Sequence, residues 1–467
     1  MNVGIVTVTA LLLAAVAADG DDFDLLSAGA QSRGVVSVLV TGWHPITGDM
    51  APQGSSGDGM VAITGDEFVQ DLRTASDQVA VTRRYDNLPV LAMTMDGAAL
   101  RRAKSQSGVE LWEDPLLWPL LSDSTEMVGA SEAWRRDYTG LGVVVAVIDD
   151  GVDIEHPFFG RQAIFEACFA DRCPNGRPQM VGPGAAQPVG THGTHVAGIV
   201  LGRSGPDGLS GVGPALHLVM INVANRDADG MKSNSVIAAL DLIITLARYN
   251  PGVIGAVNMS LGVPRNTSGV CRSRAWDLAS ALLRQHGVAV VVASGNDSSA
   301  SHAEPVRFPA CVEGFIGVGA VSKAADVADL SNSGPTLELL APGVEILSSV
   351  FGSSAGRMTR GFARLSGTSM AAPHVAAALA LLHQAAPGST VAERVRALQE
   401  TGRPVTDARS GIAAPLIHVG RAIKYLHTEA SSAQIGAPSS VRQPLVRLQL
   451  PDDDEDAGQQ WESITGG

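Results

Sequence analysis

The sequence predicts an α/β fold, a mostly parallel sheet with helices on both faces, preceded by a small α+β domain. From about Gly142, continuous Val- and Ile-rich runs alternate with helical patterns, which indicates parallel strands buried on both faces. Before that point, alternating strands and amphipathic helices follow the order βαββαβ. A chain of 467 residues that is 45% hydrophobic is long enough to bury more than one core.

The small domain is expected over residues 31–117. Its strands alternate apolar and polar residues, whereas its helices carry an apolar stripe along one face. It does not combine the residue types of a catalytic site. The expected strands are 35–43, 79–85, 88–95 and 109–114, and the expected helices are 66–75 and 97–106.

The larger domain is expected over residues 122–427. In open parallel sheets, ligands bind beyond the carboxyl ends of the strands. The polar residues that are candidates for catalysis stand at those ends. The expected strands are 143–148, 216–223, 253–260 and 287–294, and the expected helices are 194–201, 234–248, 274–286 and 369–384.

The two ends of the chain differ from the rest. Residues 1–18 lack charged side chains, and their apolar stretch is too short to span a membrane, so we expect a signal peptide. A short membrane anchor or a wrongly assigned start of the chain is the alternative, because the basic start of a signal peptide is missing. Residues 428–467 are polar and contain the acidic block PDDDEDAG, which is typical of a disordered tail.

The net charge and the hydropathy of the chain exclude two kinds of binding partner, nucleic acid and the membrane interior. A formal net charge of −14 and a pI near 5.2 exclude nucleic acid, whose binding requires a basic surface. Every long apolar run after the start is interrupted by Gly or a charge, so we expect no stable membrane span. The chain is expected to be secreted or extracytoplasmic, and monomeric.

The chain has four cysteines, at 168, 173, 271 and 311. An even number in an exported chain allows disulfides, and four cysteines allow three pairings. We favour Cys168 with Cys173, which are close in sequence, and Cys271 with Cys311, which flank one helix and strand. Free buried thiols are the alternative.

Asp149 and His192 are candidates for proton-transfer chemistry. Asp149 ends a buried strand, where a carboxylate is held rigidly and can orient an imidazole. His192 and His195 open a helix, but zinc requires three or four protein ligands and the chain has no H-E-x-x-H motif. We therefore expect no metal site, with His192 facing a cleft and His195 packed one turn deeper.

Ser369 is the candidate nucleophile. It follows Gly367 and Thr368 at the start of an apolar helix, where unpaired N–H groups and the helix dipole favour a developing oxyanion. A helix-capping role is the alternative for any single Ser. Asn296 follows another buried strand, where its amide could donate to the same oxyanion.

These residues stand in motifs that resemble the subtilisin-like serine protease family, the subtilases. The motifs are VAVIDDG, THGTHVAG, NMSLG, ASGN, SNSGP, APG and GTSMAAPHVA, in the family's order over roughly residues 128–427. The order Asp, His, Ser is also the order of the catalytic triad residues in subtilisin. The resemblance is specific because all seven motifs occur together.

The resemblance implies a serine endopeptidase that acts on polypeptides. Ser369 would attack the peptide carbonyl, His192 would transfer the proton, and Asp149 would hold the imidazole. Asn296 would contribute to the oxyanion hole. The remaining expected substrate-binding residues are Ser260, Leu261 and Gly262, which would lie along the substrate, and Ala293, Ser294 and Gly295, a wall of the first specificity pocket.

The resemblance also implies that residues 31–117 are an inhibitory propeptide, so that the enzyme is made as an autoprocessed zymogen. The cut is expected between Trp118 and Thr125. No cofactor is required; structural calcium is common in the family, but no ligands for it are assigned. Asp150 stands where the family usually has Ser or Thr, and it either repels Asp149 or points to solvent. Asn266 is the expected acceptor for N-glycosylation in a eukaryotic secretory path.

Two other classes of function remain. One is a catalytically degenerate protein that keeps the subtilase fold for binding or as a scaffold, and Asp150 is the only residue that favours it. The other is a metal-dependent hydrolase, which the missing third ligand disfavours.

Overall fold

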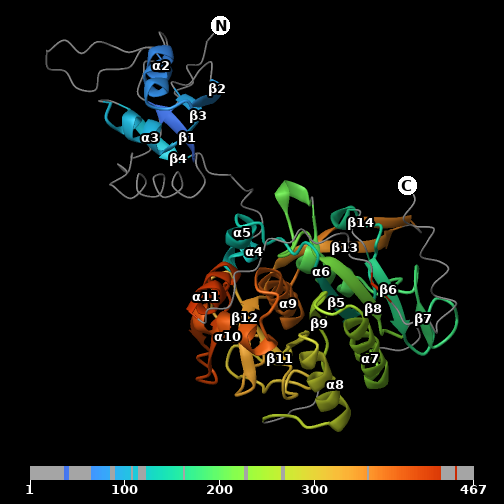
Figure 1. Cartoon of the computed structure of the whole chain (residues 1–467). Coiled ribbons are helices and arrows are strands. Elements are labelled where there is room, and N and C mark those ends of the chain that lie inside the picture. The colour runs from blue at the N-terminus through green and yellow to red at the C-terminus, as the bar shows by residue number, and fades with distance from the viewer. Residues whose placement is uncertain are drawn as a thin grey trace, which may run out of the picture. The chain divides into compact units, whose positions relative to one another are not determined.

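The computed structural model describes residues 36–41, 65–84, 90–106, 109–113, 123–160, 164–203, 205–225, 230–263, 269–354, 357–432 and 448–449. The chain divides into two compact units between Trp118 and Pro119 (Figure 1). The expected signal peptide, Asn266, the part of the expected cleavage segment before Asp123 and most of the acidic tail lie outside the described residues.

The N-terminal unit has the expected βαββαβ order. Its antiparallel sheet has the strand order β2-β3-β1-β4. Val38 and Val40 of β1 are buried together with Phe68 and Leu72 of α2, because their apolar positions follow the strand and helix periods. The elements are β1 (Val36–Thr41), α2 (Gly65–Ala75), β2 (Ala80–Arg84), β3 (Val90–Met95), α3 (Gly97–Lys104) and β4 (Glu110–Glu113).

The second unit is built on a ten-stranded sheet with the order β15-β16-β12-β11-β10-β9-β5-β8-β6-β7. All neighbouring strands in it are parallel except the edge pairs β6–β7 and β15–β16. The prediction of a mostly parallel sheet is therefore confirmed. The strands are β5 (Val144–Asp149), β6 (Ile164–Phe169), β7 (Gln179–Val181), β8 (His217–Asn222), β9 (Ile254–Met259), β10 (Ala289–Ala293), β11 (Ile316–Val321), β12 (Leu337–Pro342), β15 (Arg403–Thr406) and β16 (Ala413–Leu416).

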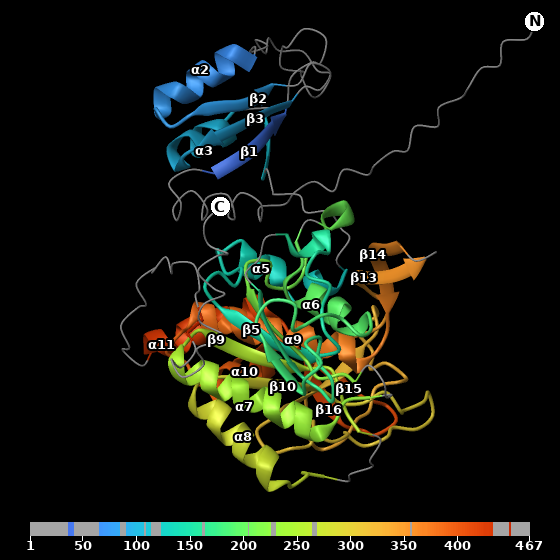
Figure 2. The ribbon, with the colours of Figure 1, turned by 90° about the vertical axis from the view of Figure 1, so that its right-hand side faces the viewer.

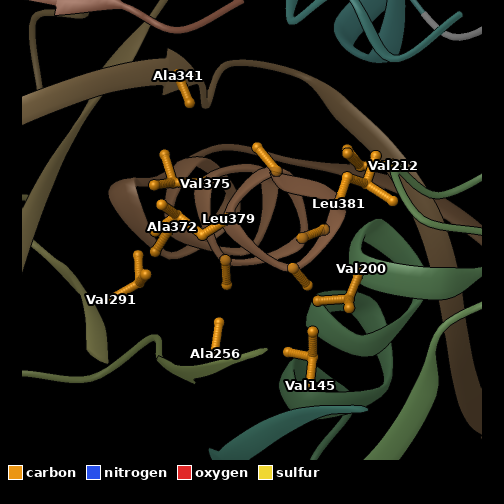
Figure 3. Close-up of a cluster of buried hydrophobic side chains, with 14 of the residues drawn as sticks. Val145, Val200, Val212, Ala256, Val291, Ala341, Ala372, Val375, Leu379 and Leu381 are labelled. Atoms are coloured by element: carbon orange, nitrogen blue, oxygen red, sulfur yellow. The ribbon is translucent and has the colours of Figure 1, made fainter. Parts of the chain in front are cut away.

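Helices cover both faces of this sheet. Alternate residues of β5 enter two different cores: Val145 and Val147 pack in one with α6 and α9, and Ala146 and Ile148 pack in the other with α7 and α8. Figure 3 shows the first core around α9, and Figure 2 shows α7 and α8 side by side. The helices are α6 (His192–Leu201), α7 (Ser233–Tyr249), α8 (Arg274–Gln285) and α9 (Thr368–Ala385).

Several further elements complete the second unit. The hairpin of β13 (Ile346–Ser354) and β14 (Arg357–Leu365) packs on α6, where Ser348 Oγ donates to the carbonyl oxygen of His195 at 2.8 Å. The sequence analysis did not predict this hairpin. The remaining helices are α4 (Asp123–Met127), α5 (Ala130–Trp134), α10 (Val391–Thr401) and α11 (Val419–Ser432), with short 3-10 turns at Pro157–Phe159 and Pro206–Gly208.

The expected start of the disordered tail at residue 428 is too early, because α11 continues to Ser432. Farther along, Leu448 packs against the core shared with α7 and α8. The backbone of Gln449 exchanges two hydrogen bonds with the side chain of Asn250, of 2.8 and 3.0 Å. Part of the expected tail is therefore attached to the folded unit.

Two disulfides join Cys168 to Cys173 and Cys271 to Cys311, which confirms the favoured pairing. Among the described residues, no helix combines the length and the hydropathy needed to cross a membrane.

Candidate active site

Asp149 and His192 come from different elements and meet beyond the carboxyl end of the sheet. Asp149 is the last residue of β5 and is fully buried. Its Oδ1 lies 2.8 Å from Nδ1 of His192, the first residue of α6. The imidazole side chain is 35% exposed, so the ring is open to an incoming ligand. The negative charge of Asp149 outweighs burial and raises the pKa of His192 to about 9.

Asp150 lies against the same helix. Its Oδ1 accepts a 2.6 Å hydrogen bond from the N–H of Gly193. Burial and the neighbouring charge of Asp149 raise the pKa of Asp150 to about 7, and the hydrogen bond from Gly193 opposes that shift. The alternative in which Asp150 points to solvent is therefore wrong, because the carboxylate binds the start of α6.

Ser369 is the second residue of α9 and lies beside the end of β9. Its Oγ donates to the carbonyl oxygen of Ser260 at 3.4 Å, and Ser260 Oγ donates back to the Ser369 carbonyl at 2.8 Å. Asn258 in turn donates to Ser260 Oγ at 3.0 Å. Within the described residues, the structure joins the Ser369 hydroxyl to Ser260 and shows no hydrogen bond from it to His192.

Asn296 is held by the residue before Ser369. Its Oδ1 accepts hydrogen bonds from the N–H and the Oγ1 of Thr368, at 2.8 and 2.9 Å. Its Nδ2 has no protein partner among the described residues, so this donor remains available to a ligand. Thr368 was not given this role in the sequence analysis, although it stands in the quoted GTSMAAPHVA motif.

A cleft of about 250 Å³ opens beside Ser369 and Asn296. Ser294, one of the expected wall residues, does not line it: the residue is fully buried, and its Oγ donates to the Asn332 carbonyl at 3.1 Å. The other residues predicted for this region all line the cleft. The lining residues are Ser260, Leu261, Gly262, Val263, Ala293, Gly295, Asn296, Asp297, Arg307, Thr368 and Ser369.

Comparison with known proteins identifies the family of this chain. The sequence profile of the subtilase family matches residues 140–415. The chain belongs to the subtilase family. Similar proteins include the intracellular serine protease of Paenibacillus polymyxa, 33% identical over 266 residues that cover 56% of this chain and 73% of that protein. Subtilisin E of Bacillus subtilis (strain 168) is 30% identical over 325 residues, 69% of this chain and 77% of its own.

A solved structure of a protease from Pseudoalteromonas arctica PAMC 21717 is similar to this subtilase. It has a TM-score of 0.54 and 26% sequence identity, and the similarity covers 66% of this chain and 98% of that one. The family and these serine protease relatives make the chain a serine-type endopeptidase.

Three residues near the cleft of this subtilase were missed in the sequence analysis. Asp297 and Arg307 line it, and Asn332 braces its loop by accepting hydrogen bonds from the N–H groups of Asp297 and Ser298 at 2.8 and 3.1 Å. The motif SNSGP contains Asn332, but nothing in the sequence shows which loop it contacts. Asp297 and Arg307 also form an ion pair, and no periodicity or spacing in the sequence predicts that contact.

His195 is packed inside this subtilase, as its position one turn deeper in the helix predicts. Its Nε2 lies 3.1 Å from the carbonyl oxygens of both Ile346 and Ala363. Burial lowers the pKa of His195 to about 4, so the ring is neutral at physiological pH. Across the described ranges, no group of three or more His, Cys, Asp or Glu side chains could hold a metal ion.

Proposed function

We propose that this subtilase hydrolyses internal peptide bonds through a triad of Ser369, His192 and Asp149. The observation that carries the proposal is the 2.8 Å contact between His192 Nδ1 and the buried Asp149 carboxylate. Because the Asp149 carboxylate accepts a hydrogen bond from Nδ1–H, the basic lone pair of the neutral ring is on Nε2, the nitrogen that would take the proton of Ser369.

In the proposed reaction, Ser369 Oγ attacks the carbonyl carbon of the substrate as His192 removes the hydroxyl proton. His192 then gives that proton to the leaving amine, and water repeats the sequence on the acyl-enzyme. This requires the Ser369 hydroxyl to turn from the Ser260 carbonyl, 3.4 Å away, toward the imidazole. No cofactor takes part, since side chains carry out every proton transfer.

The proposed oxyanion hole consists of the Asn296 amide and the N–H of Ser369. Thr368 occupies Oδ1 of Asn296 with two hydrogen bonds, which supports the assignment of Nδ2 as the donor that faces the oxyanion. Loss of one such donor typically lowers the rate by about 100- to 1000-fold.

We also propose that the N-terminal unit is an inhibitory propeptide that the enzyme itself removes, with the cut between Trp118 and Thr125. Its own hydrophobic core and the division of the chain next to this segment support the proposal. Two disulfides support export, because disulfides persist in oxidising compartments. The relatives include both subtilisins and intracellular serine proteases, so the family alone leaves the location open.

An active-site-directed fluorophosphonate tests the nucleophile. The purified mature chain should be labelled and should hydrolyse casein, whereas Ser369→Ala should neither be labelled nor release the N-terminal unit. Ser301→Ala is the matched control, since Ser301 is exposed and away from the cleft. A Ser369→Ala chain that still processes itself would exclude Ser369 as the nucleophile.

A further inference from the structure

The cleft beside Ser369 is lined by residues 260–263 on one segment and by Ala293 and residues 295–297 on another, and Arg307 also lines it. A Cβ placed on Gly262 would lie 3.9 Å from Cβ of Arg307, and one placed on Gly295 would lie 3.0 Å from its Cγ. The aliphatic stem of Arg307 therefore packs against both segments. Its backbone is also fixed, because the Arg307 N–H donates to the Ser294 carbonyl at 2.9 Å.

The guanidinium connects the two segments through its polar contacts. Its Nη1 donates to the Val263 carbonyl at 3.3 Å, and its Nε forms an ion pair with Asp297. The side chain of Arg307 is 11% exposed and that of Asp297 is 39% exposed. Asn332 holds the carboxylate from behind, with Nδ2 donating to Asp297 Oδ2 at 3.3 Å. The Val263 carbonyl and Asn332 therefore hold this pair at the cleft.

An ion pair in this position affects which side chains fit beside it. A long apolar side chain would remove water from the pair without replacing its hydrogen bonds. A long acidic side chain would approach Asp297, and a long basic one would approach the Arg307 guanidinium, so each meets repulsion together with attraction. A short side chain avoids the pair, and an amide can both donate to the carboxylate and accept from the guanidinium.

We propose that the Arg307–Asp297 pair sets the cleavage preference of this enzyme for small or neutral polar side chains on the acyl side of the bond. The inference rests on the proposed function, because it takes the cleft beside Ser369 as the site that binds this side chain. Arg307 and Asp297 are then specificity-determining residues and take no part in the chemical steps.

A peptide library varied at the residue before the cleaved bond tests the proposal in the mature enzyme. Casein hydrolysis first establishes activity, which tests the proposed function separately. The unaltered enzyme should cut after Ala, Ser, Asn and Gln with kcat/KM at least about 10-fold higher than after Phe, Leu, Lys or Glu, a range that one pocket contact can produce.

Two variants separate the roles of the pair. Arg307→Gly should raise kcat/KM for Phe and Leu by about 10-fold or more and leave Ala nearly unchanged, because the cleft becomes deeper and loses its cation. Asp297→Asn keeps the shape and leaves the guanidinium without its counter-charge, so it should raise cleavage after Glu by about 10-fold. Arg177→Gly, at an exposed loop position, is the control. An unaltered enzyme that already prefers Phe and Leu, with a preference that neither variant changes, would overturn the proposal.

Discussion

Asp150 Oδ1 accepts a 2.6 Å hydrogen bond from the backbone N–H of Gly193, the residue that follows His192. The helix has no side-chain cap of its own at Thr191, so Asp150 supplies an acceptor for its first turn. A Cβ on Gly190 would lie 2.4 Å from Asp150 Oδ2, and one on Gly193 would lie 2.8 Å from Oδ1. Both glycines therefore leave room for the carboxylate, and Asp150 positions the helix that carries His192.

Asp150→Ala should lower kcat/KM by about 5-fold, because it removes a cap whose loss typically costs about 1 kcal/mol and loosens the turn that holds His192. Asp150→Asn keeps an acceptor and removes the charge. It should retain most of the activity but move the acidic limb of the kcat/KM profile to lower pH, since the charge of Asp150 also raises the pKa of His192. Asp326→Asn, an exposed change, is the control. An acidic limb that stays fixed in Asp150→Asn would exclude the electrostatic part of this role.

The pH dependence of the enzyme should reflect the pKa of His192, which Asp149 raises to about 9. Protonated His192 cannot accept the Ser369 proton, so kcat/KM should increase with pH through the alkaline range. Asp149→Asn should shift this limb to lower pH and reduce kcat strongly, because the amide no longer stabilises the imidazolium. Because the folded pKa lies above the unfolded value of 6.5, this pair stabilises the fold below pH 6.5, and that stabilisation is lost as pH rises through about 9. Denaturant titrations of the inactive Ser369→Ala chain at several pH values measure the second effect.

Three buried histidines should make the fold sensitive to acid. Burial lowers the pKa values of His195, His374 and His383 to about 4. The unfolded chain therefore takes up protons below pH 6.5 that the folded chain does not, so stability falls as pH falls from 6.5 toward 4. The free energy of unfolding should fall by up to about 1.4 kcal/mol for each histidine and each pH unit. Urea unfolding of the Ser369→Ala chain at pH 7 and pH 5 measures it, and adding His302→Gln, at an exposed ring, should leave the difference unchanged.

The two disulfides should contribute unequally to stability. The pair Cys271–Cys311 is separated by 40 residues and Cys168–Cys173 by 5. By lowering the entropy of the unfolded chain, the disulfide that closes the longer loop should raise the free energy of unfolding by about 4 kcal/mol. The disulfide that closes the shorter loop should raise it by about 2 kcal/mol. Replacing both cysteines of each pair by Ser and comparing unfolding midpoints tests the order. A larger loss from the short loop would contradict the loop-entropy explanation.

The Asn296 amide should contribute to the rate and little to substrate binding. Asn296→Ala should lower kcat by about 100- to 1000-fold with a small change in KM, because the oxyanion exists only during the reaction. Thr368→Val removes one of the two hydrogen bonds that hold Asn296 Oδ1 and should lower kcat less, whereas Thr368→Ser keeps the hydroxyl and should be close to the unaltered enzyme. Equal losses in kcat and in substrate affinity for Asn296→Ala would point to ground-state binding.

The parts of the fold that the sequence predicted are those where one strong pattern dominates. The run Val144–Ile148 is apolar at successive positions because both faces of its strand are buried, whereas a strand with one face in water alternates apolar and polar residues. The hairpin of β13 and β14 was missed because its strands mix Gly, Ser and Arg with apolar residues, and their pairing depends on packing against α6.

In the candidate site, too, the sequence predicted the residues that stand in motifs and did not predict the contacts within loops. Asp149, His192 and Ser369 stand in motifs, and the ends of parallel strands bring such motifs to one edge of a sheet. The ion pair of Asp297 and Arg307 joins residues ten positions apart in a loop, where charge identity alone does not reveal a partner. Ser294 has the expected residue type but is buried, since neighbours in a loop after a strand can face opposite ways.

The hydrogen bonds between Thr368 and Asn296 have a consequence for how the site tolerates motion. Thr368 both precedes the proposed nucleophile in the chain and holds the amide of a separate loop. A displacement of the first turn of α9 would therefore carry the Asn296 amide with it. The spacing between the proposed attacking atom and the proposed donor would then be kept while both move relative to the rest of the molecule.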